Sequence, residues 1–259
     1  MSELKGIYAL WYREFKVFTR ERSRVVSSII NPLLWLFIIG TGLGSFLSFG
    51  PVGYQAFLYP GILIMTSLFS AVFFGVYIVW DKKVDFMKEV LVAPMRRTSI
   101  FIGKILGGST DTLIQTMILI VIGIALSFAG ILQIHFTVLS ILVTVVFLFV
   151  ITVGLCAIGL IIGSQMESPE GFQLIISFLI FPLFFLSGAI FPIYNQSGVL
   201  STIVLVNPVT YAVDGMRGVL IGRGPQLGQF DPWLDFLVIT IFSAIMVAIG
   251  TYAFKKMKL

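Results

Sequence analysis

Charged side chains are scarce in this sequence and are absent from long stretches of it. Only 11% of the 259 residues are charged, against about a quarter in an ordinary soluble domain. Four stretches contain no Asp, Glu, Lys or Arg: residues 25–80, 112–166, 171–213 and 236–254. A helix needs about 20 apolar residues to cross roughly 30 Å of hydrocarbon, so these stretches leave room for six spans. The composition excludes an ordinary soluble domain and predicts an all-α membrane protein.

Residues that carry catalytic or metal chemistry are equally scarce. The sequence holds one histidine, His135, and one cysteine, Cys156, which excludes a Cys/His metal cluster and an intrachain disulfide. The phosphate cradle Gly-x-x-x-x-Gly-Lys-Ser/Thr does not occur. We therefore expect no catalytic residue, metal or cofactor in this chain.

Ionisable groups inside the predicted spans are too few for ion-coupled transport. Asp111 is the only carboxylate well inside a span, whereas a pump or an ion-coupled transporter usually needs several such groups. A structural hydrogen bond is the favoured role for Asp111, and Lys104, two helical turns before it, is expected to reach the interface. Energy for any transport should come from outside the lipid.

Proline, glycine and polar turns divide the apolar stretches into six spans within one transmembrane domain, residues 25–259. The segment at 191–232 contains Asn195, Gln196 and Asn207-Pro208, which make 193–213 a poor seventh span. Short helices re-entering the outer leaflet fit it better. The six spans are predicted at about 25–48, 55–80, 100–128, 136–163, 171–190 and 233–254.

The distribution of basic residues predicts the orientation in the membrane. Six lysines and arginines lie in residues 1–24, six in 81–104 and three near the C terminus, whereas the turns at 49–53 and 129–135 have none. Because cytoplasmic loops are enriched in basic residues, six spans with both termini in the cytoplasm fit this distribution. The positive charge thus favours lipid phosphates over nucleic acid as a partner.

Residues 1–24 read as an amphipathic helix in the membrane interface. Apolar and aromatic side chains fall on one face at 100° per residue, and basic ones fall on the other. A helix packed on a protein partner is compatible with the same pattern. The apolar face holds Leu4, Ile7, Tyr8, Trp11, Phe15 and Phe18, and the basic face holds Lys5, Arg13, Lys16 and Arg20.

The loop at 81–99 is the densest group of charges after the N terminus. Asp81 is a candidate N-cap and Pro94 a stop signal for a short helix between them. Val84, Met87 and Leu91 are predicted to share one side of it, and Asp85 can pair with Lys88 at i, i+3. Such a helix can lie on lipid or dock in the groove of a partner, and the residues alone leave both open.

Four segments together resemble the ABC-2 type permeases, the membrane subunits of ATP-binding cassette exporters. They are Asn-Pro-Leu-Leu-Trp-Leu at 31–36, Tyr-Pro-Gly-Ile-Leu at 59–63, Lys-Glu-Val-Leu-Val-Ala-Pro-Met-Arg-Arg at 88–97 followed by Gly103-Lys104, and Asn-Pro-Val-Thr-Tyr-Ala-Val-Asp-Gly-Met-Arg at 207–217. The resemblance covers essentially the whole chain and is greatest to the drug-resistance and nodulation exporters.

This resemblance implies the partners and the working parts. It implies two permease copies, or a heterodimer, with separate ATPase subunits that hold ATP and Mg. It also implies a plasma or inner membrane location and short outer helices that close the pathway. The 81–94 loop would be the coupling helix, with contacts to the ATPase from Asp85, Met87, Lys88, Glu89, Leu91, Pro94, Arg96 and Arg97.

A pathway between spans one, two and five would then carry an amphipathic substrate, such as a drug, a lipid or a lipid-linked glycan. An ATPase-independent channel or scaffold is the alternative, and co-purification of an ATPase would distinguish the two. Arg217 is expected to be structural, pairing with Asp214 or capping a short helix. Aromatic candidates for lining the pathway are Phe69, Phe73, Phe74, Phe178, Phe181, Phe184 and Phe185.

Overall fold

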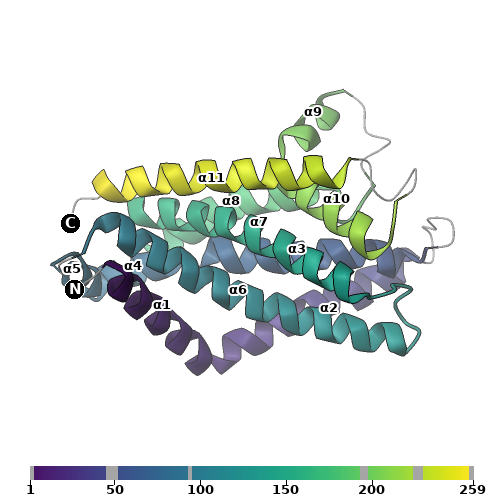
Figure 1. Cartoon of the computed structure of the whole chain (residues 1–259), viewed down its shortest axis with the longest axis horizontal. Coiled ribbons are helices and arrows are strands. Elements are labelled where there is room, and N and C mark those ends of the chain that lie inside the picture. Colours follow the sequence, from purple (N-terminus) through teal and green to yellow (C-terminus); the bar gives the residue numbers. More distant parts are fainter. Residues whose placement is uncertain (1–2, 45–51, 93–94, 193–197, 224–229, 257–259) are drawn as a thin grey trace.

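The computed structural model describes residues 3–44, 52–92, 95–192, 198–223 and 230–256, and these residues form helices without a β-strand. Most helices run side by side along the long axis of the molecule (Figure 1). In chain order they are α1 (Glu3–Arg20), α2 (Arg22–Gly44), α3 (Tyr54–Phe73), α4 (Val76–Lys83), α5 (Phe86–Val92), α6 (Arg97–Phe128), α7 (Val138–Gln165), α8 (Pro169–Phe185), α9 (Val199–Val206), α10 (Pro208–Leu220) and α11 (Pro232–Lys256).

Five helical segments in the described part of the chain are long and apolar enough to cross a membrane. These are α2, the combined α3–α4 segment Tyr54–Lys83, α6, α7 and α11. They match the predicted first, second, third, fourth and sixth spans. The predicted fifth span corresponds to α8, an apolar helix of 17 residues, which extends about 25 Å and stands at the short end of the spanning range. The chain is a membrane-embedded helical protein.

The segment after α8 contains two short helices instead of one straight span. α9 and α10 meet at Asn207 with a bend of 78°. Asn207 caps α10 by accepting a hydrogen bond on Oδ1 from the Val209 N–H, and its own amide donates to the Leu183 carbonyl. Pro208 follows as the first residue of α10, where its missing N–H costs nothing. Asn207 and Pro208, which weakened this segment as a span, therefore build its corner, whereas Asn195 and Gln196 lie outside the described residues.

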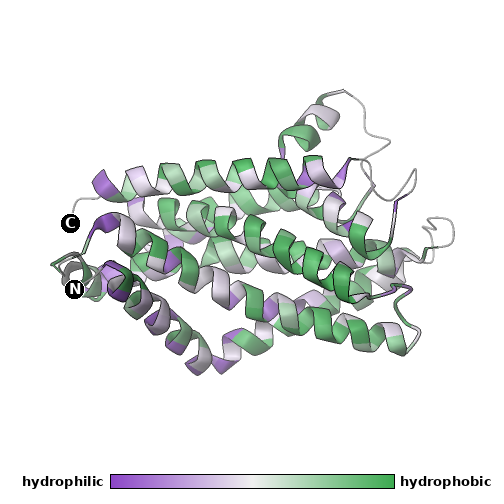
Figure 2. Cartoon of the chain, in the orientation of Figure 1, coloured by the Kyte–Doolittle hydropathy of each residue, from purple (hydrophilic) through white to green (hydrophobic). Residues whose placement is uncertain are grey.

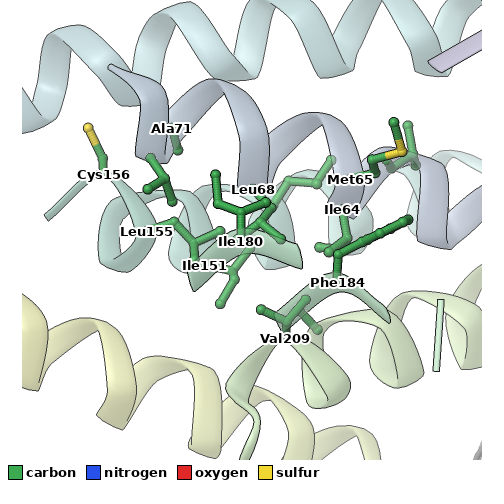
Figure 3. Packing of buried hydrophobic residues seen from close by; sticks show 14 of the residues in the cluster. Ile64, Met65, Leu68, Ala71, Ile151, Leu155, Cys156, Ile180, Phe184 and Val209 are labelled. Atoms are coloured by element: carbon green, nitrogen blue, oxygen red, sulfur yellow. The ribbon is translucent and has the colours of Figure 1, made fainter. Parts of the chain in front are cut away.

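The core lies where α3 is surrounded by α7, α8 and α10, and Figure 3 shows the side chains that fill it. The α3 backbone comes very near α7. A Cβ added at Gly75, between α3 and α4, would lie 2.0 Å from the Gly159 carbonyl oxygen. Small residues at such crossings let membrane helices approach closely. The resulting van der Waals packing stabilises their association, because the hydrophobic effect does not hold helices together within lipid. The labelled side chains are Ile64, Met65, Leu68, Ala71, Ile151, Leu155, Cys156, Ile180, Phe184 and Val209.

The beginning of α1 and the end of α11 lie at the same end of the bundle, together with α4 and α5 (Figure 1). We call this the terminal end, and the opposite end, where α6 passes into α7, the distal end. Figure 2 shows apolar residues along the middle of the long helices and hydrophilic residues on α1 and at the helix ends. This banding is the one that a bilayer around the bundle requires.

Candidate coupling site at the terminal end

Four charged side chains meet at the terminal end in what we call the charge cluster: the buried Glu14, Asp81 and Lys104, and Arg13, which is 34% exposed. The Lys104 ammonium donates to Asp81 Oδ2 at 2.6 Å and to Glu14 Oε1 at 3.0 Å. Arg13 donates from Nη2 to Asp81 Oδ1 at 2.8 Å and from Nη1 to Glu14 Oε1 at 2.7 Å. Two cations thus neutralise two carboxylates, and each carboxylate bonds to both cations. The cluster joins α1, α4 and α6.

The lysine sits deepest in this cluster. Its side chain has no exposed surface, and those of Glu14 and Asp81 are 2% and 6% exposed. Removing ions from water is expensive unless every charge is paired, so the members depend on one another. Burial alone would lower the pKa of Arg13, but its hydrogen bonds and proximity to Asp81 and Glu14 hold that pKa above its ordinary value.

The helix α1 reaches the cluster because glycines on α6 let it approach. A Cβ added at Gly107 would lie 2.6 Å from the Glu14 Cβ, and one at Gly103 would lie 3.0 Å from the Leu10 Cβ. Leu10, Glu14 and Phe18 are the buried residues of α1 and repeat at i, i+4. The expected helix is confirmed, and it packs on α6. Arg13, expected to face lipid phosphates, instead pairs with Asp81.

Two further expectations for this region are wrong. Asp81 lies in the last turn of α4 and points into the cluster, so it does not cap the next helix. Lys104 does not reach out to the interface, because Glu14 and Asp81 hold it inside. Glu14 was missed altogether. The sequence pattern that indicates its burial is a single acid four residues after Leu10 and four before Phe18, on an otherwise apolar face of the helix.

A tight turn separates the cluster from α5, the short helix of the predicted coupling loop. Asp85 adopts a positive φ of 58° in this turn, a conformation that Asp tolerates better than most residues. Directly after it, the Phe86 ring lies under the Arg13 guanidinium, with Cζ 4.0 Å from the ring centroid. This cation–π contact connects α5 to the charge cluster. Sequence reasoning did not single out Phe86.

The two sides of α5 differ from the prediction. Met87 is 1% exposed and Val90 is 7% exposed, and both belong to the core of this chain, whereas Val84 precedes the helix and is 67% exposed. Met87 and Val84 therefore do not share a face, and Met87 does not lie on the open surface. Among the described side chains of α5, Val92 is the apolar one with an open surface, at 82% exposed.

The far flank of the loop is also attached to α1. The Glu3 carboxylate accepts hydrogen bonds from the Ser99 hydroxyl and the Arg96 N–H, and these lower its pKa. Arg97 donates to the Lys255 carbonyl at 3.2 Å, which connects α6 to the end of α11. Among the other coupling candidates, Pro94 lies outside the described residues, and so do the side chains of Lys88, Glu89 and Leu91.

A second polar group lies deeper, between α2, α4 and α6. Arg24 Nη1 donates to the Tyr77 hydroxyl at 2.6 Å, and that hydroxyl donates to Glu21 Oε2 at 2.6 Å. The same Nη1 lies 3.8 Å from Asp111 Oδ2. Asp111 is 1% exposed, and its Oδ1 has no hydrogen-bond partner. The carboxylate singled out in the sequence thus faces Arg24 and not Lys104.

The aromatic candidates lie in three settings: a cluster between α3 and α8, an exposed position on α8, and the core, whose Phe184 also meets Phe69. The Phe69 ring stacks on Phe73 at 6.3 Å and meets the Phe181 ring edge-on at 6.0 Å, and Phe181 stacks on Phe185. These four form one cluster between α3 and α8. Phe178 is 82% exposed. Phe74 and Phe184, at 1% and 2% exposed, are core residues of this chain.

Arg217 on α10 is fully enclosed near the distal end. Its guanidinium lies 3.8 Å from the Phe57 ring centroid and donates to the Gly188 carbonyl at 2.9 Å and to the Phe57 carbonyl at 3.3 Å. Asp214 accepts a hydrogen bond from the Phe230 N–H. Arg217 thus joins α10 to α3 and to the turn after α8, which is a structural role.

Comparison of the sequence with known protein families gives one match. The profile of the ABC-2 type transporter family matches residues 5–221, which is most of the chain. The chain belongs to the ABC-2 type transporter family. Its members are the membrane subunits of ATP-binding cassette transporters and carry no ATPase of their own. Membership in this family therefore implies ATPase subunits as partners.

The relatives of this ABC-2 permease align along most of its length. A putative transport permease, ycf38, from Cyanophora paradoxa is 27% identical over 98% of this chain and 89% of its own. Nodulation protein J from Azorhizobium caulinodans is 26% identical over 93% and 92%. A probable doxorubicin resistance ABC transporter permease, DrrC, from Mycobacterium tuberculosis is 25% identical over 89% and 82%. The family match over residues 5–221 spans the charge cluster, α5 and the α9–α10 corner.

Proposed function

We propose that this chain is the transmembrane subunit of an ABC exporter that moves an amphipathic substrate out of the cytoplasm. Candidate substrates are drug-like molecules, lipids and lipid-linked glycans. Separate ATPase subunits, which hold ATP and Mg²⁺, supply the energy. The similarity to a permease named for doxorubicin resistance supports a small amphipathic substrate.

The observation that carries the proposal is the attachment of α5 to the charge cluster. An ATPase that contacts the open side of α5 moves Phe86, and Phe86 touches Arg13. Arg13 is bonded to Asp81 on α4 and to Glu14 beside Lys104 on α6. Because Glu14, Asp81 and Lys104 are buried and paired, separating them is costly, so α1, α4 and α6 move together when α5 moves Arg13. The cluster thus transmits force from the docked ATPase into the spans.

In the proposed arrangement the chain lies in the plasma or inner membrane, and its terminal end faces the cytoplasm. The basic residues around α1, α5 and the end of α11 support this orientation. Two copies of the permease form the pathway, with the α3–α8 aromatic cluster of each toward the other. The polar face of α1 lies against lipid phosphates, and α9 and α10 re-enter the outer leaflet and close the pathway.

A charge placed on the open side of α5 tests the docking. Val92→Glu puts an unpaired carboxylate where the ATPase contacts α5, and we expect at least a tenfold loss of the ATPase subunit that co-purifies with the tagged permease. Val138→Glu is the matched control, because Val138 is 77% exposed and begins α7 at the distal end. Equal recovery of the ATPase with both variants, at equal permease yield, would reject docking at α5.

A further inference from the structure

A pocket lined by polar and apolar side chains lies between α2, α3 and α6, apart from the charge cluster, and Ser27 and Asn31 stand at its exposed edge. Its volume is about 280 Å³, and its walls come from α2, α3 and α6. Arg24 stands at one side, and Pro32, Met65 and Phe69 supply apolar walls. The rest of the lining consists of uncharged hydrogen-bonding side chains: Ser27, Ser28, Asn31, Thr66, Ser70 and Gln115.

One lining residue is a buried side chain without a partner. Gln115 is 1% exposed, and neither its amide nitrogen nor its amide oxygen has a hydrogen-bond partner within the described chain. Leaving a buried amide unpaired costs several kcal/mol in a medium without water. The Ser28 carbonyl is a further acceptor, because Pro32, one turn later in α2, has no N–H to donate to it. At Gln115 the pocket thus presents a donor and an acceptor that the described chain does not satisfy, whereas the hydroxyls of Ser28, Thr66 and Ser70 each make a hydrogen bond within the chain.

The charges around the cavity indicate what kind of group it accepts. Arg24 already lies 3.6 Å from Glu21 and 3.8 Å from Asp111, so its charge is paired within the chain. The described lining holds no second cation that could bind a phosphate or carboxylate. An uncharged head group with several hydroxyls or amides fits both the lining and the charge balance.

We propose that this cavity binds the uncharged, hydroxyl-rich or amide-bearing head of an amphipathic molecule, such as a glycosyl head on an alkyl chain. Gln115, Asn31 and Thr66 bind the head, and Met65 and Phe69 contact the start of the apolar chain. A volume of about 280 Å³ is near the lower limit for ligand pockets, which suits one ring-sized head. This assignment rests on the proposed export function and narrows its substrate class.

Photolabelling of the permease alone tests the assignment without the ATPase. The probe is an alkyl glucoside that carries a diazirine next to the sugar, added to phosphatidylcholine vesicles that contain the permease. We expect labelled peptides from residues 24–32 and 65–70. Unlabelled alkyl glucoside should suppress that labelling, whereas alkyl phosphate and alkyl trimethylammonium of equal chain length should not. Suppression by either charged amphipath at the same concentration would overturn the assignment.

Two variants make the result specific to the cavity. Gln115→Leu removes the unpaired amide and should lower labelling at least tenfold without lowering the melting temperature, because that amide makes no hydrogen bond. Gln165→Leu is the matched control, since Gln165 is exposed and does not line the cavity. Asn31→Leu on α2 should repeat the loss independently of packing on α6. Unchanged labelling in both cavity variants would refute the site.

The source of the head group is distinguished in the same vesicles. A two-chain glycolipid built into the bilayer competes with the probe if the site takes a resident lipid, whereas competition by the single-chain glucoside alone indicates a transported amphipath. If neither glycoside competes, the assignment fails. Such a failure would leave the Val92→Glu result untouched, so it is distinct from a failure of the export proposal.

Discussion

Single residues in this permease matter chiefly through the charges they bury. The sequence predicts where charge is absent, because the bilayer imposes that requirement on each segment separately. It does not predict which charges meet. Glu14 and Lys104 are 90 positions apart, and their pairing depends on α1 packing on the glycines of α6. For that reason Asp81 was interpreted as a cap and Arg13 as a lipid contact.

The charge cluster predicts the effect of removing its deepest cation. Lys104→Met leaves Glu14 and Asp81 buried with only Arg13 to balance them. Removing one member of a buried ion pair costs about 3–5 kcal/mol, so the purified variant should unfold at a clearly lower temperature. Adding Asp81→Asn to Lys104→Met removes the surplus charge and should recover part of the loss. A single variant that melts with the wild type would show that the cluster does not stabilise the fold.

At the scale of helices, the arrangement follows from where backbones can approach. The existence of most helices was predictable, because apolar runs and Pro-Gly breaks are local signals. The points where helices cross have no local sequence signal. Gly75 packs on Gly159 of another span, and neither segment alone predicts this contact. The burial of Met87 on α5 also differs from the prediction, because helical spacing alone does not show which side of a short helix faces the core.

The crossing of α3–α4 with α7 predicts a packing defect. In Gly75→Ala the new methyl would stand 2.0 Å from the Gly159 carbonyl oxygen, so the two backbones must separate. Overpacking of this kind costs about 1–3 kcal/mol, and the melting temperature in detergent should fall. Gly42→Ala is the matched control, because it makes the same change within α2 with nothing within 4 Å of the added Cβ. Equal melting of the two variants would contradict the close crossing.

At the scale of the whole molecule, the terminal and distal ends face different compartments. Orientation is the part of the account that rests most on sequence, since it depends on the distribution of basic residues. The structure adds that α5 and the described ends of α1 and α11 share one end (Figure 1). One orientation therefore decides the side of all three.

Cysteine labelling in intact cells checks the orientation. In a Cys156→Ala background, Gly53→Cys at the distal end should react with an impermeant maleimide from outside. Lys83→Cys at the terminal end should react only after permeabilisation. Both positions are exposed, so reactivity reports the side of the membrane rather than burial. The reverse pattern would place α5 outside and remove any role for a cytoplasmic ATPase.

The most direct test of the account is transport per ATP hydrolysed when the contact between α5 and the charge cluster is cut. Phe86→Leu keeps an apolar side chain but removes the ring below Arg13, whereas Phe86→Tyr keeps the ring. In vesicles with the ATPase bound, we expect the leucine variant to hydrolyse ATP while moving several-fold less amphipathic substrate per ATP. The tyrosine variant should match the wild type. An unchanged ratio of transport to hydrolysis in Phe86→Leu would contradict coupling through this cluster.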